Sequence, residues 1–253
     1  MELLDILMVG VVVGLAALIQ SAVGFGFLVF ATPLILWIGF TLPEVVTLVS
    51  TCSTLQAALG ARHLKASVPW RLTWTATAVR LIAVVIGLYL LTKIVNLDVN
   101  YVKLVVGSIV GLIVIAKLLC QPQPAEKAHW GWAGFAFVIS GLLSGICGIG
   151  GPPLVIWSTL QNWPTNKIRG FLFAVLAIST PIQIFLLGLT FGVGLFKYVA
   201  IGIAFFPVAL LGYGVGLPIG NRMRKKRHRL IVDIILLLVA ASTVLGAVIS
   251  KWH

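Results

Sequence analysis

The stretch Ser144-Gly-Ile-Cys-Gly-Ile-Gly-Gly-Pro-Pro153 lies inside an apolar run near residues 131–160. Glycine and proline both disfavour a continuous helix, so the run predicts two helices with a break between them. A second apolar run, near residues 6–38, contains Gln20-Ser-Ala-Val-Gly-Phe-Gly26 and then Pro33, and it predicts a similar break. As one helix this second run would be about 50 Å long against a hydrocarbon core of about 30 Å, so it must bend, tilt or turn back.

The composition is that of an integral membrane protein. Of the 253 residues, 60% are hydrophobic and 9% are charged, and the mean hydropathy is +1.13. Because Glu2 and Asp5 precede the first apolar segment, it does not resemble a signal peptide, and we expect it to remain in the mature protein. The sequence predicts an all-α polytopic membrane protein with eight hydrophobic segments, near 6–38, 45–61, 70–92, 101–119, 131–160, 170–190, 195–219 and 230–250.

Internal similarity divides the chain into two homologous halves of four segments each. The polar connector near the midpoint predicts a first repeat over 1–120, a linker over 121–129 and a second repeat over 130–253. Matching residues recur at offsets of 121 to 127 positions: Gly24-Phe-Gly26 with Gly148-Ile-Gly150, Pro43 with Pro164, Gln56 with Gln183, and Gly87 with Gly212.

The distribution of Lys and Arg selects an arrangement of the segments. If all eight cross the membrane once, ten basic residues lie on one side and seven on the other. If segments 1 and 5 return to the side that they entered, the counts become thirteen and four, which agrees much better with the positive-inside rule. The two halves would then be inverted repeats, and the two glycine breaks could meet near the membrane midplane. Paired broken helices at membrane depth are typical of a transporter's binding site.

The broken segments resemble a known family. Ser21-Ala-Val-Gly-Phe-Gly-Phe27 followed by Pro33, and Ser144 to Leu154 followed by Trp163-Pro164 and Arg169, are similar to the duplicated signature of the sulfite exporter TauE/SafE family. The resemblance implies a multi-pass transporter of the bacterial inner (plasma) membrane, with sulfite, sulfonates such as sulfoacetate, or related organic acids as candidate substrates. It does not select one of these anions, the direction of transport or a coupling ion.

Hydrogen-bond donors near the breaks are the candidate ligands of an anion. Amides at glycine turns can bind oxyanions, and hydroxyl and amide side chains are tolerated in a membrane. We expect positive φ at Gly148 and Gly150, which only glycine adopts freely. The alternative is that the glycines only allow close helix packing. The candidate substrate-binding residues are Gln20, Ser21, Gly24, Phe25, Gly26, Phe27, Ser53, Gln56, Arg80, Ser144, Cys147, Gly148, Ile149, Gly150, Gly151 and Gln183.

Arg80 is the one basic residue in the middle of a predicted segment. A charge that faces lipid there costs at least about 2.5 kcal/mol, so we expect Arg80 to face the interior and to attract an anion. The alternative is that its side chain extends to the headgroups from a tilted helix.

The remaining polar residues predict no other function. The cysteines Cys52, Cys120 and Cys147 have no paired spacing, the histidines lie at segment ends or in loops, and no metal motif or nucleotide loop is present. We expect no enzyme activity, cofactor or metal; an intramembrane enzyme and a non-transporting scaffold or receptor are the alternatives to a transporter. The net charge of +12 includes a basic run at 222–229, which predicts a cytoplasmic loop that contacts anionic lipid headgroups and not nucleic acid. Assembly as a homo-oligomer is left open.

Overall fold

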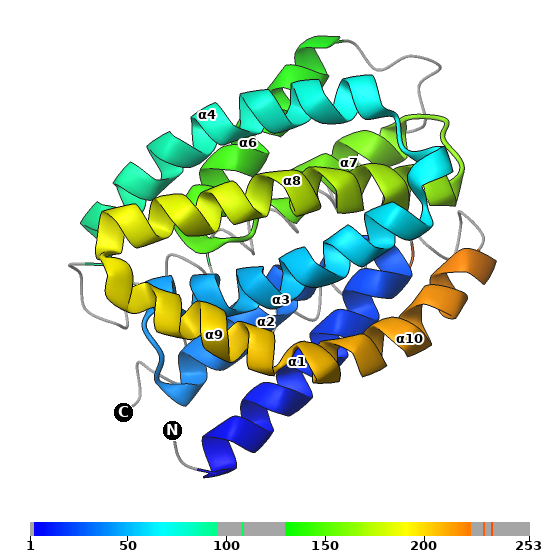
Figure 1. The fold of residues 1–253 in the computed structure, drawn as a ribbon. Coiled ribbons are helices and arrows are strands. Elements are labelled where there is room, and N and C mark those ends of the chain that lie inside the picture. The colour runs from blue at the N-terminus through cyan, green and yellow to red at the C-terminus, as the bar shows by residue number, and fades with distance from the viewer. Residues whose placement is uncertain (1–2, 96–107, 109–129, 224–229, 231–233, 235–253) are drawn as a thin grey trace.

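The computed structural model of the chain describes residues 3–95 and 130–223, together with the single positions 108, 230 and 234. Every element in this part of the chain is a helix (Figure 1). The predicted segments near 101–119 and 230–250, the linker at 121–129 and nearly all of the basic run at 222–229 lie outside the described residues.

The described helices follow the predicted apolar segments. Four of them, α1, α3, α4 and α8, are long and apolar enough to cross a membrane, and α9 with α10 would make a fifth span if the two are counted together. The protein is therefore a membrane protein, and the part of it that the structure describes is helical. The elements are α1 (Leu3–Val23), α2 (Phe27–Ile38), α3 (Leu42–His63), η1 (Lys65–Ser67), α4 (Trp70–Ile94), α6 (Trp130–Cys147), α7 (Gly151–Leu160), α8 (Thr165–Phe191), η2 (Val193–Leu195), α9 (Phe196–Ala204) and α10 (Phe206–Arg222).

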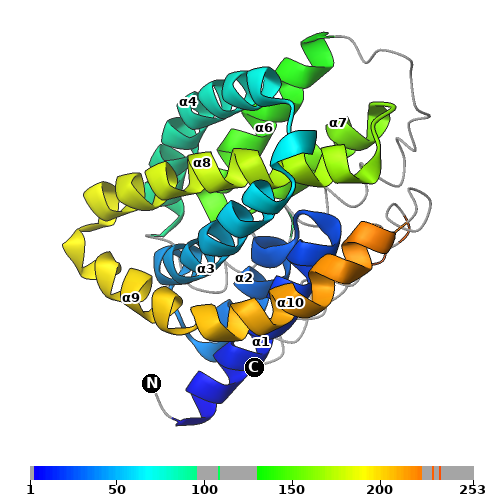
Figure 2. The same cartoon turned by 45° about the vertical axis from the view of Figure 1, so that its right-hand side comes forward.

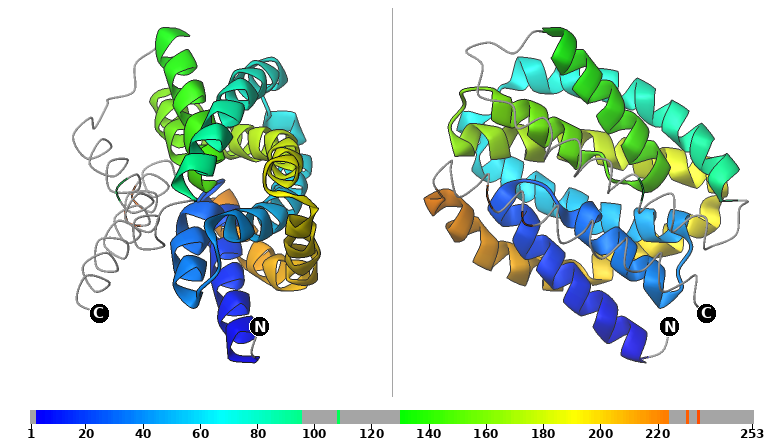
Figure 3. Two further views of the ribbon diagram at one scale, coloured as in Figure 1. Left: turned by 90° about the vertical axis from the view of Figure 1, so that its left-hand side faces the viewer. Right: turned by 180° about the vertical axis from the view of Figure 1, so that it is seen from behind.

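Both long apolar runs break at their glycines, as the sequence predicts. Helix α1 gives way to α2 across residues 24–26, and α6 gives way to α7 across residues 148–150. Gly24, Gly26 and Gly148 have φ of 96°, 108° and 77°, in the left-handed region that favours glycine. After each break the short helix turns back along the long one, α2 along α1 and α7 along α6 (Figure 3). Each broken run therefore forms a helical hairpin.

The seventh segment differs from the prediction of one uninterrupted span. Helix α9 ends at Ala204, α10 begins at Phe206, and the two axes are bent by 48°. Pro207 lies in the first turn of α10, where its missing N–H and its ring prevent a straight continuation from α9.

The helices pack in a reciprocal pattern between the two halves of the sequence. Helix α1 of the first half packs on α10 of the second, and α6 of the second half packs on α4 of the first. Helices α3 and α8 contact each other between these pairs, and Figure 2 shows α3 between α8 and α10. A pseudo-two-fold relation between the halves would produce this pattern.

Two matching glycines lie at close contacts between helices. A Cβ atom added to Gly87 of α4 would overlap the carbonyl oxygen of Leu142 and lie 2.9 Å from Cα of Gly145, on α6. A Cβ atom added to Gly212 of α10 would overlap the carbonyl oxygen of Gly14 and lie 2.9 Å from Cβ of Ala17, on α1. Small residues allow such close backbone approach in membranes.

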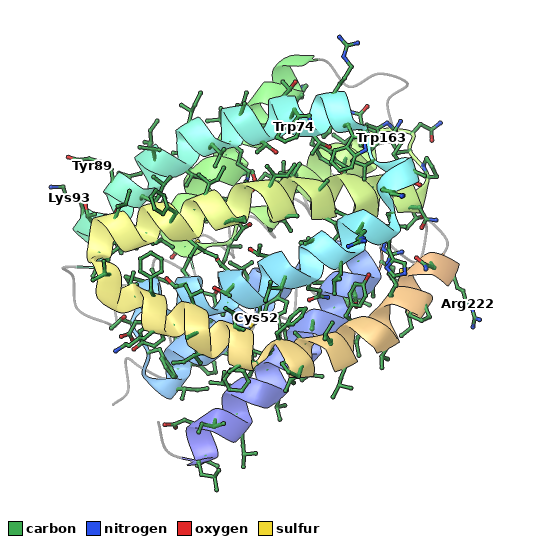
Figure 4. All side chains as sticks on the ribbon, in the orientation of Figure 1. Cys52, Trp74, Tyr89, Lys93, Trp163 and Arg222 are labelled. Atoms are coloured by element: carbon green, nitrogen blue, oxygen red, sulfur yellow. The ribbon has the colours of Figure 1, made fainter. Side chains whose placement is uncertain are left out.

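Basic side chains gather at one end of the helical bundle. The C-terminus of α3, the start of α8 and the C-terminal part of α10 meet there, since Tyr213 contacts His63 and Arg169 contacts Asn221. Figure 4 labels Arg222 at this end and Lys93 at the other. This basic end carries Arg62, Lys65, Arg71, Lys167 and Arg222, whereas the opposite end carries Lys93 and Lys197 together with Glu44.

Substituting alanine at either glycine contact should destabilise the fold. We expect Gly87→Ala and Gly212→Ala each to cost about 1 to 3 kcal/mol, because the added methyl group forces two backbones apart. Gly134→Ala and Gly214→Ala are matched controls with no heavy atom within 4 Å of the added Cβ, and they should be as stable as the parent or up to about 1 kcal/mol more stable, because alanine favours a helix interior. Thermal unfolding of the purified variants in detergent measures the difference. Equal stability of all four variants would contradict the close-contact interpretation.

Candidate functional site

The Arg80 side chain lies inside the protein at the second break. It is 1% exposed, as the sequence analysis expected of an interior position. Its guanidinium donates from Nε to Ser140 Oγ at 3.1 Å, from Nη2 to Ser144 Oγ at 2.7 Å, and from Nη1 to Ser179 Oγ. The two acidic side chains in the described part of the chain lie elsewhere, Asp5 in the first turn of α1 and Glu44 in the first turn of α3. The partners of Arg80 are therefore neutral hydroxyls.

Two of the hydroxyls that accept from Arg80 donate to groups around the break, and the third, Ser179 Oγ, donates to the Val175 carbonyl of its own helix at 2.6 Å. Ser140 Oγ donates to the Gly150 carbonyl at 2.5 Å, and Ser144 Oγ donates to Gln183 Oε1 at 2.6 Å. Gln183 Nε2 in turn donates to the Ser144 carbonyl at 2.7 Å. We call this group the Arg80 cluster: Arg80, Ser140, Ser144, Ser179, Gln183 and Gly150.

Gly150 is required by lack of space and not by its backbone conformation. Its φ is −86°, so the predicted positive φ is wrong at this position and correct at Gly148. A Cβ atom on Gly150 would lie 2.5 Å from the Ser140 carbonyl oxygen and 2.8 Å from Nη2 of Arg80. The guanidinium thus approaches the backbone where a side chain would otherwise stand.

The first break carries a related arrangement of serine and glutamine side chains. Ser53 Oγ donates to Gln20 Oε1 at 2.9 Å, which is the counterpart of the Ser144–Gln183 bond. At the first break the glutamine is on α1 and the serine on α3, whereas at the second the serine is on α6 and the glutamine on α8. Gln56 Nε2 donates to the Ala17 carbonyl at 2.6 Å, as Gln183 does to the Ser144 carbonyl. The matching glutamines therefore make matching bonds to the first helix of their own half.

The two breaks contact each other, as the sequence analysis suggested. A Cβ atom on Gly151 would lie 3.2 Å from Cδ2 of Phe25, and one on Gly148 would lie 2.7 Å from Cδ2 of Leu28. Phe25 and Ile149, at the centres of the two breaks, are almost completely buried. The breaks thus form one continuous interior region.

The predicted ligands are all buried except Gly151, which is half-buried, but several amides already have partners. Gly24, Gly148 and Gly150 donate to the carbonyls of Gln20, Ser144 and Gly148 at 2.7, 2.8 and 3.1 Å. Pro152 follows the second break without an N–H to offer. An anion would have to displace these backbone bonds, whereas each hydroxyl of the Arg80 cluster could turn toward it by giving up one side-chain hydrogen bond.

The remaining predicted ligands lie around these bonds. Ser21 Oγ donates to the Leu18 carbonyl at 3.0 Å, outside the Arg80 cluster, and the Cys147 thiol donates to the Leu143 carbonyl at 3.3 Å. Phe27 is completely buried in the first turn of α2.

Two buried polar residues near the breaks are not among the predicted ligands: Ser140, and Arg169, which the sequence places only in the family signature. Ser140 is four residues before Ser144 and thus on the same face of α6, a spacing that could have identified it. Arg169 was counted among the basic residues outside the apolar segments because segment 6 was expected to begin at 170. Helix α8 begins at Thr165 instead, and the Arg169 side chain is 0% exposed.

Comparisons with known proteins identify the family. Residues 7–243 match the family model described as sulfite exporter TauE/SafE. A relative from Cupriavidus necator, described as "Probable sulfite/organosulfonate exporter TauE", is 26% identical over 188 residues, which cover 72% of this chain and 71% of that protein. No solved structure matches the chain significantly. Because the family model covers nearly the whole sequence, the chain belongs to the sulfite exporter TauE/SafE family.

Proposed function

We propose that the protein is a secondary transporter that exports small oxyanions, and that Arg80 and its serines bind the anion during passage. The observation that carries this proposal is a buried guanidinium whose hydrogen-bond partners are three serine hydroxyls. A charge buried without a counter-ion is costly, and an anion beside it recovers part of that cost through Coulomb attraction.

The cluster suits an anion with several oxygens. Arg presents N–H donors in a planar fork that matches carboxylate and related oxyanions. The three serine hydroxyls accept from Arg80 in the structure, and by rotating they could instead donate to an oxygen of the anion. Sulfite, sulfonates such as sulfoacetate and short carboxylates all offer two or more acceptor oxygens. The relative described as a sulfite/organosulfonate exporter supports sulfur oxyanions as the first candidates.

We infer that the basic end faces the cytoplasm of a bacterial cell and that transport runs outward. Lys and Arg predominate on the cytoplasmic side of membrane proteins, and anionic lipid headgroups there would contact them. An interior-negative potential of about 100 mV assists the export of each negative charge by about 2.3 kcal/mol, so no coupling ion is needed for this direction.

Removing the charge of Arg80 should reduce transport. Reconstituted in liposomes, Arg80→Gln should transport sulfite at least about tenfold more slowly than the parent, because a buried charged partner contributes about 2 kcal/mol or more to binding. Arg80→Lys should be intermediate, since it keeps the charge and loses the fork. The measurement is the initial flux of sulfite, sulfoacetate, thiosulfate and short carboxylates.

A matched control removes an exposed charge from the same helix. Arg71→Gln lies on α4 at an exposed position and should transport as the parent does. No flux of any anion by the folded parent would exclude the transporter, and equal flux by Arg80→Gln and Arg71→Gln would exclude the role of Arg80.

The orientation can be tested with two exposed lysines at opposite ends. Lys65 follows α3 at the basic end and Lys197 lies in α9 at the other. We expect a membrane-impermeant maleimide to label Lys197→Cys in intact cells and to label Lys65→Cys only after permeabilisation. The unmodified chain, with its buried Cys52 and Cys147, provides the background. The reverse labelling pattern would place the basic end outside.

A further inference from the structure

A second buried arginine lies at the first break. Arg169, in the second turn of α8, donates from Nη2 to the Ser21 carbonyl at 2.6 Å and from Nη1 to Asn221 Oδ1 at 2.8 Å. Its side chain fits where two glycines leave room: a Cβ on Gly24 would lie 3.0 Å from Cα of Arg169, and one on Gly220 would lie 2.5 Å from its guanidinium carbon. The side chain is thus held in a narrow slot between the first break and α10.

The charge of Arg169 has no acidic partner among the bonds that the structure describes. Both described partners are neutral oxygens, and Nε is buried with no hydrogen-bond partner at all. Glu44 is at the opposite end of the bundle, where it accepts from Tyr198 and from the Thr41 amide. A buried N–H without a partner is unfavourable because its lost hydration is not replaced, so the slot leaves both a charge and a donor for a ligand to satisfy.

The depth of Arg169 differs from that of Arg80. Helices α4 and α8 both begin at the basic end, with Arg80 ten residues after Trp70 and Arg169 four residues after Thr165. At about 1.5 Å per residue these positions are about 15 Å and about 6 Å along their helices. Arg169 therefore lies closer to the basic end, and the contact of Phe25 with Gly151 joins the two breaks.

Capping of α1 explains only part of this arrangement. The Ser21 carbonyl is in the last turn of α1, where a cation interacts favourably with the helix dipole. That role would be filled by a single donor. It does not require complete burial of a guanidinium whose Nε has no partner.

We propose that Arg169 is a second oxyanion-binding site, at the first break and nearer the basic end, which the anion occupies before it reaches the Arg80 cluster. This inference rests on the proposed function, because it concerns the same substrates and the same path. The anion would accept from Nε of Arg169 and gain the Coulomb attraction of a guanidinium that faces no carboxylate in the structure described.

The test is calorimetric titration of the purified, folded protein with sulfite. The parent should bind two sulfite ions per chain. In Arg169→Gln one site should keep its affinity, and the affinity of the other should fall at least about tenfold. Arg169→Lys should keep both sites with intermediate affinity at one, because the charge remains. The matched control, Lys167→Gln, removes a charge two residues earlier on α8, from a side chain that stacks on Trp163 at 4.8 Å, and should titrate as the parent does.

The outcomes separate this inference from the proposed function. If Arg169→Gln binds sulfite with the same stoichiometry and affinity as the control Lys167→Gln, the second site is excluded. Binding at Arg80 then still stands. If the parent binds neither sulfite nor sulfoacetate, both proposals are excluded. Should Arg169→Gln fail to fold, diffraction from parent crystals soaked in selenite, a heavier anion of the same shape, decides the question. An anomalous peak beside Arg169 is expected, and a peak only at the Arg80 cluster would overturn the inference.

Discussion

Backbone polar groups at the two helix breaks need partners inside an apolar protein, and this requirement shapes the rest of the structure. In a membrane an unpaired N–H or C=O costs several kcal/mol, so an interrupted helix is tolerated only where other groups satisfy it. The chain meets the requirement with side chains from the broken helix itself, α6, and from α8. Ser140 donates to the Gly150 carbonyl, Gln183 to that of Ser144, and Arg169 to that of Ser21.

The same side chains are the candidate ligands of the anion, so their structural and functional roles compete. A hydroxyl of the Arg80 cluster that turns toward an anion gives up its bond to a carbonyl or to Gln183. Such an exchange costs little only if the anion replaces what is lost, since the net contribution of one hydrogen bond is about 1 kcal/mol. A bound anion can therefore change which groups hold the break together, and this couples occupancy to the conformation of the hairpins.

Sequence reasoning predicted the features that depend on local composition. Apolar length located the helices, and the glycines located both breaks. The burial of Arg80 followed from its depth in an apolar segment with no acidic neighbour. The sequence analysis did not find features that depend on contacts between helices. The sequence predicts a positive φ at Gly150, whereas this glycine instead provides room for Arg80. Arg169 lies within helix α8, whose start is about one turn earlier than the apolar segment in the sequence indicates.

The two arginines also cross between the sequence halves. Arg80 comes from the first half and serves the second break, whereas Arg169 comes from the second half and reaches the first. The closest helix contacts cross in the same way, α4 with α6 and α1 with α10, and glycines bring their backbones into direct contact. These crossed pairs are therefore stiff, while the bonds that join them to α3 and α8 are polar and can exchange partners. Arg80 lies within one stiff pair and meets α8 through Ser179, and Arg169 on α8 meets the other pair through Ser21. A shift of α8 would consequently alter the surroundings of both arginines at the same time.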